Sequence, residues 1–112
     1  MKKVNANFIY KQGKQSLISD FRGLDSDVDI MNLLSQCVNT LDEIKELKRL
    51  VFEHNKVYDH NILSVCIHDK NIKIITVADD NIEVPKKLFV QMINDWEIFL
   101  KHKKDFKKEY FI

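Results

Sequence analysis

The 112-residue sequence predicts an α+β fold in which an antiparallel sheet packs against a long helix and a C-terminal amphipathic helix. Three observations predict it. Two short β-branched runs at 61–67 and 72–77 flank a polar loop, apolar residues recur at steps of three and four over 26–53, and a proline opens a second helical stripe that continues to Leu100. A chain of this length builds one core, so residues 1–112 are expected to form a single domain.

The first half of the chain is expected to hold a β-hairpin followed by the long helix. Short apolar runs on either side of the glycine-containing turn at 11–14 favour a hairpin over residues 4–18. Ser26 with Asp29 three residues later is a capping-box pattern, so the helix is expected to begin near Ser26. Weak helix formers at 38–40 leave open a bend or a split into two helices.

The second half is expected to be a meander followed by the amphipathic helix. The two β-branched runs form a hairpin through the loop at 68–71, and a turn at 79–81 leads into a short strand at 82–84. Because both runs are apolar on both faces, they are expected inside the sheet and not at its edge. Pro85 fits the first turn of the last helix, and the basic segment 101–112 is expected to fray.

Composition favours a cytoplasmic protein. Apolar residues make up 45% and charged residues 31% of the chain, and no apolar run approaches the roughly 18 residues of a membrane span. The N-terminus lacks the long apolar run of a cleavable signal peptide. Cys37 and Cys66 fall at interior positions of a helix and a strand, so both are expected to be reduced thiols.

No catalytic, metal or nucleotide motif is recognisable. The acids at 25–29 have the spacing of a calcium loop, but Ile30 replaces the glycine at its sixth position and Gln36 replaces the closing glutamate, so helix capping is the better interpretation. Cys66 and the three nearby histidines do not supply four well-spaced zinc ligands. With two glycines in the chain, a phosphate loop or an oxyanion hole is not expected. The sequence therefore predicts a protein without enzymatic activity or cofactor.

Charge is unevenly distributed along the chain. Residues 25–85 carry twelve acids and six bases, whereas the segments on both sides are net basic. Helix-dipole preferences account for part of this pattern, and an acidic surface that faces a basic partner would account for the rest. The candidate partner-binding residues are Asp25, Asp27, Asp29, Asp42, Glu46, Asp79, Asp80 and Glu83.

Residues 61–100 run through strand, polar turn, strand, acidic turn and proline-started helix, and end in Trp96-x-x-Phe99-Leu100. This order resembles the C-terminal half of small immunity proteins of bacterial polymorphic-toxin and contact-dependent growth inhibition systems. The resemblance implies a cytoplasmic protein that binds one cognate toxin, often a nuclease, and blocks its active site.

A nuclease site is basic because it holds phosphate, so a tight inhibitor presents carboxylates to it. The alternative function is a nucleic-acid- or membrane-associated accessory protein that uses the lysines and aromatic residues of 101–112.

Overall fold

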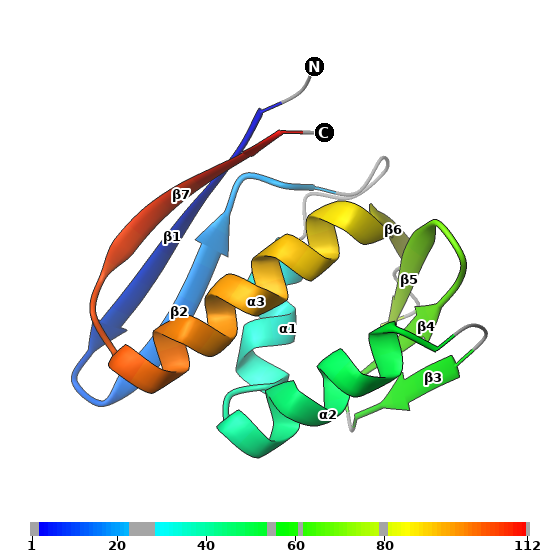
Figure 1. Ribbon diagram of the computed structural model, residues 1–112, viewed down its shortest axis with the longest axis horizontal. Coiled ribbons are helices and arrows are strands. Elements are labelled where there is room, and N and C mark those ends of the chain that lie inside the picture. Colours follow the sequence, from blue (N-terminus) through cyan, green and yellow to red (C-terminus); the bar gives the residue numbers. More distant parts are fainter. Residues whose placement is uncertain (1–2, 23–28, 54–55, 61, 79–80, 112) are drawn as a thin grey trace.

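The computed structural model describes residues 3–22, 29–53, 56–60, 62–78 and 81–111. These residues form two antiparallel sheets and three helices, which confirms the predicted α+β class (Figure 1). In the view of Figure 1 the longest helix runs between the two sheets.

The N-terminal hairpin is confirmed. Strands β1 (Lys3–Lys11) and β2 (Lys14–Ser19) pair antiparallel, with Lys11 opposite Lys14. Gln12 and Gly13 form the two-residue turn, with φ of 52° and 78°. Positive φ at both turn positions gives the turn a twist that matches the right-handed twist of the two strands. Glycine adopts a positive φ without steric cost.

The expectation that residues 101–112 fray is wrong. Strand β7 (Phe106–Phe111) pairs antiparallel with β1 and completes a sheet of order β2-β1-β7. Phe106 stacks on Phe8 with ring centroids 4.3 Å apart, and Tyr110 is buried. These two inward aromatic residues dock the strand, while most of the charged residues between them remain exposed.

The C-terminal meander is confirmed and has one more strand than expected. Its order is β3-β4-β5-β6, all antiparallel, so β4 and β5 lie inside the sheet as predicted. The strands are β3 (Lys56–Asp59), β4 (Leu63–Ile67), β5 (Asn71–Thr76) and β6 (Asn81–Pro85). The sequence pattern missed β3 because only four residues form it, too few for a periodic signal.

The expected long helix is two helices, the split that the weak helix formers left open. Helix α1 (Ile30–Cys37) is capped by Asp29, whose carboxylate accepts from the backbone N–H of Asn32. The expected start at Ser26 lies outside the described residues. Helix α2 (Leu41–Val51) is capped by Thr40, whose hydroxyl accepts from the N–H of Glu43. This second cap makes two helices more favourable than a continuous one.

Helix α3 (Lys86–His102) follows Pro85 as predicted and carries the aromatic centre of the core. Trp96 is buried, stacks on Phe99 and donates a 2.6 Å hydrogen bond from Nε1 to the backbone oxygen of Val38. The prediction that Trp96 packs in the core is confirmed. No helix within the described residues has the length and apolar content needed to cross a membrane.

Candidate protein-binding surface

Asp29 is occupied by contacts within the chain. Its carboxylate accepts hydrogen bonds from the backbone N–H and the hydroxyl of Ser19, both at 2.8 Å, and from the N–H of Asn32 at 3.1 Å. Arg22 approaches it at 3.8 Å, and the Asp29 side chain is only 15% exposed. This residue therefore ties β2 to the start of α1, and its carboxylate has little freedom to bind a partner.

The acids of α2 are largely balanced by a neighbouring arginine. Arg49 binds Glu46 at 2.7 Å and Glu53 at 3.0 Å, and the hydrogen bond from Arg49 lowers the pKa of Glu46. Asp42 is exposed in the first turn of α2, where a carboxylate complements the helix dipole. The exposed side of α2 thus presents little net negative charge.

Glu83 is the predicted residue best placed for contact with a partner. It is exposed on β6 and lies opposite Lys73 of β5. Asp42 stands on α2, which packs against the buried side of the four-stranded sheet, whereas Glu83 is exposed on the other face of that sheet, so the two acids do not share one surface. The remaining candidates, Asp25, Asp27, Asp79 and Asp80, lie outside the described residues.

The outer face of the four-stranded sheet is the surface that the sequence reasoning missed. Alternate residues of each strand point to opposite faces, and one set, which includes Val65, Ile74 and Val84, is buried. Helices α2 and α3 pack against this sheet on the buried side. The other set forms the open face, where Val57 is 52% and Val77 is 73% exposed.

The open face has an apolar centre, defined here as the open-face patch. Its members are Val57, Ile62, Cys66, Ile75 and Val77. The strand register joins four of them as two pairs, with Ile75 in the row between: Val57 lies opposite Cys66, and the backbone N–H of Val77 donates to the oxygen of Ile62 at 3.1 Å. Contiguous exposed apolar residues of this kind mark interaction sites more often than scattered ones do.

Polar residues border the patch, and Ser64 lies within it, opposite Ile75 and between Ile62 and Cys66 along the chain. The hydroxyl of Ser64 donates to Asp59 at 2.6 Å, and the register continues from Cys66 through Lys73 to Glu83. An apolar centre with a polar rim is the usual anatomy of a protein–protein interface. The sequence does carry a signal for this surface, because β4 and β5 have apolar residues on both faces. Within the described residues, helices pack against only one of those faces.

The thiol of Cys37 is shielded from solvent. Cys37 is buried at the end of α1, and burial, together with the neighbouring Glu43, raises the pKa of its thiol. A raised pKa disfavours the thiolate that reacts as a nucleophile. His60 Nε2 lies 4.0 Å from Glu43, and His68 is exposed at the β4–β5 turn. Among the described residues, no group of three or more histidine, cysteine or acidic side chains is arranged to hold a metal ion.

The aromatic residues that suggested nucleic-acid or membrane contact are mostly used inside the fold. Tyr110 is buried and Phe106 is partly buried, and only Phe111, at 54% exposure, is open to solvent. A stacking platform for bases needs several exposed rings.

Comparison with family models, with curated proteins and with solved structures gives no match. The functional argument therefore rests on the residues and their geometry.

Proposed function

We propose that this protein is a non-catalytic inhibitor that binds and neutralises a cognate protein toxin, as the resemblance of residues 61–100 to immunity proteins implies, and that it binds through the open-face patch. The observation that carries the proposal is the uncovered apolar centre of the four-stranded sheet. Its exposed residues supply apolar area that a partner would remove from water at about 25 cal/mol per Å².

Charge around the patch favours a basic partner. Asp59 and Glu83 lie on the open face, where Lys73 is the single cation among the described residues. The chain between β5 and β6 adds Asp79 and Asp80 in the sequence. A nuclease-type toxin is basic around its active site, and opposite charges speed encounter and reject wrong partners. The apolar centre supplies affinity, and the acidic rim supplies orientation.

The test pairs this chain with the protein encoded beside its gene. We expect the C-terminal domain of that neighbour to arrest bacterial growth when it is expressed alone. Co-expression of this chain should restore growth, and the two purified proteins should elute as one complex in size-exclusion chromatography. A neighbour that is not toxic, or one that this chain neither binds nor inhibits, contradicts the proposal.

Charged substitutions locate the surface. Val77→Glu and Val57→Glu alter exposed side chains and should leave the fold intact. Each should weaken the complex by at least about 10-fold, because burying an unpaired carboxylate costs more than about 1.4 kcal/mol. Ile98→Glu is the matched control, since Ile98 is equally apolar, 50% exposed and carried by α3 outside the patch. Equal effects of all three variants would place the contact elsewhere.

A further inference from the structure

A groove runs between α3 and the outer strand of the N-terminal sheet. Residues 108–111 of β7 form one wall, and Lys87, Gln91, Asn94 and Asp95 of α3 form the other. Its volume is about 490 Å³. The spacing of Lys87, Gln91 and Asn94 places them on one stripe of the helix, so the groove follows the helix axis.

The groove opens onto the edge of β7 that pairs with no strand in the described part of the chain. Neighbouring side chains in a strand point to opposite faces, as the buried Tyr110 and the exposed Phe111 do. Consecutive residues of one strand can line the same groove only along the strand's edge. The other edge of β7 pairs with β1, which contributes no residue to the groove. The backbone groups on the free edge are therefore positioned to pair with an added strand.

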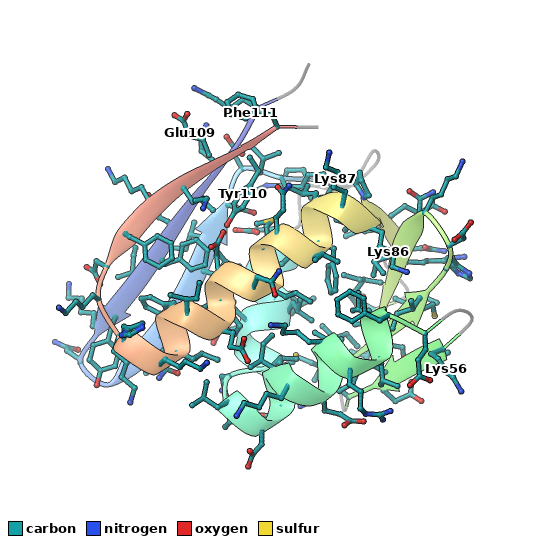
Figure 2. The ribbon with its side chains drawn as sticks, in the orientation of Figure 1. Lys56, Lys86, Lys87, Glu109, Tyr110 and Phe111 are labelled. Atoms are coloured by element: carbon teal, nitrogen blue, oxygen red, sulfur yellow. The ribbon has the colours of Figure 1, made fainter. Side chains whose placement is uncertain are left out.

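The groove lining holds two lysines and two acids, and contacts among the described residues engage every one of these charges except Lys87. The Tyr110 hydroxyl donates to Asp95 at 2.7 Å, and Lys108 Nζ lies 3.6 Å from the same carboxylate. Glu109 pairs with Lys3 at 3.5 Å. Lys87 makes no ion pair with any described residue, and Figure 2 shows it on the side of α3 nearer to Tyr110 and Phe111.

We propose that this groove binds an extended acidic segment of a partner protein as an additional strand beside β7. Backbone hydrogen bonds to the free edge supply affinity, and Lys87 selects carboxylates on the added segment. The exposed ring of Phe111 offers an apolar contact at one end. This site is separate from the open-face patch and does not depend on the function proposed above.

A second copy of this chain is the less favourable occupant. Its own β7 strand carries Lys107, Lys108 and Glu109 and is therefore net positive. Such a strand would meet Lys87 with like charge, whereas an acidic segment meets it with opposite charge.

Random decapeptides displayed on phage provide the probe. Selection on the purified wild-type chain should enrich peptides rich in Asp and Glu. In ¹⁵N NMR titrations, the selected peptides should shift the amide signals of residues 107–111 and of the first half of α3. Selection without acidic enrichment, or shifts that fall elsewhere, would overturn the proposal.

Two neighbouring lysines provide a matched pair of variants. Lys87→Glu and Lys86→Glu change the net charge equally, and both put an acid in the first turn of α3, where it suits the dipole. Figure 2 shows Lys86 on the side of α3 that faces the four-stranded sheet. We expect K87E to weaken a selected acidic peptide by at least about 10-fold at low salt and K86E by less than about 2-fold. Equal losses would mean that the charge acts only at long range, and the assignment to this groove would be wrong.

Two further measurements separate the alternatives. Sedimentation of the wild-type chain should show a monomer, and a dimer that protects the amides of β7 from hydrogen exchange would identify a second copy as the occupant and overturn the proposal. Val77→Glu should leave peptide affinity unchanged. If the toxin test fails while acidic peptides still bind, only the proposed function is wrong. If the toxin is neutralised but no acidic peptide binds, only the proposal for the groove is wrong.

Discussion

Tyr110 anchors β7, so its removal tests whether the C-terminal segment is a docked strand. The ring is buried, and the hydroxyl donates a 2.7 Å hydrogen bond to Asp95. Burial, together with Asp95, raises the pKa of Tyr110 above its usual range, so the hydroxyl remains a donor at neutral pH. Two substitutions separate the two contributions, because Tyr110→Phe removes only the hydroxyl and Tyr110→Ala removes the ring as well.

The expected magnitudes follow from these contacts. A hydrogen bond to a charged group contributes about 1.5–3 kcal/mol, and Asp95 retains Lys108 when the hydroxyl is lost, so Tyr110→Phe should cost about 1–2 kcal/mol. Truncation of a buried aromatic ring costs about 3–5 kcal/mol, which is the expectation for Tyr110→Ala. Each kcal/mol corresponds to roughly 4 °C in Tm for a chain of this size.

Urea unfolding followed by tryptophan fluorescence measures these values, because Trp96 is the single tryptophan and lies in the core. Phe111→Ala is the matched control, since the adjacent ring is 54% exposed and its loss should cost less than about 1 kcal/mol. If Tyr110→Ala costs no more than Phe111→Ala, β7 is not docked through Tyr110 and the reasoning fails. An unchanged slope of free energy against urea would show that the variants alter stability and not the compactness of either state.

Three more predictions concern pH, thiols and association. The hydrogen bond from Lys48 lowers the pKa of Glu97 below its ordinary 4.5, so the stability that it contributes is present above that pH and is lost as pH falls through the lower folded-state pKa. Glu97→Gln should therefore cost roughly 1 kcal/mol at pH 7 and much less at pH 3 in urea unfolding, and an equal cost at both pH values would refute the ion-pair explanation. Ellman's reagent should modify the partly exposed Cys66 in the native state and Cys37 only after unfolding, and a rapidly reacting thiol in Cys66→Ser would contradict the buried placement of Cys37. Lys73→Ile extends the open-face patch and should promote concentration-dependent association in sedimentation, whereas a variant as monomeric as the wild type would argue that the patch is not adhesive.

Elements with strong local signals could be predicted from the sequence. The β4–β5 hairpin follows from two β-branched runs around a polar turn, and α3 follows from Pro85 and a helical stripe of apolar residues. Strand β7 could not, because Phe106 and Tyr110 are separated by charged residues and become recognisable as strand residues only when β1 lies beside them. Its partner in the sheet is about a hundred residues away in the chain, and no local pattern records such a contact.

The candidate site was less predictable than the fold because charge along a sequence does not show which charges are paired. The sequence predicts both a capping and a partner-binding role for Asp29, whose carboxylate is bound by Ser19 and Asn32 once α1 packs beside β2. Glu46 is balanced by Arg49 on the next turn of its own helix, a pairing that the spacing of three residues would have predicted. Glu83 is exposed on the open sheet face, and its contact with a partner stays a prediction.

The open face itself follows from how the helices are distributed between the sheets. Helix α3 packs against both sheets, and α2 joins it on the inner face of the four-stranded sheet. Covering the outer face as well would need a further layer that the three helices do not provide. Apolar side chains remain on this face in spite of their exposure. Within the described part of the chain, Lys73 is the one cation beside them, in a position where a charge limits unwanted association. This combination of exposed apolar side chains and a charge that restrains self-association is the feature on which the proposed contact with a partner rests.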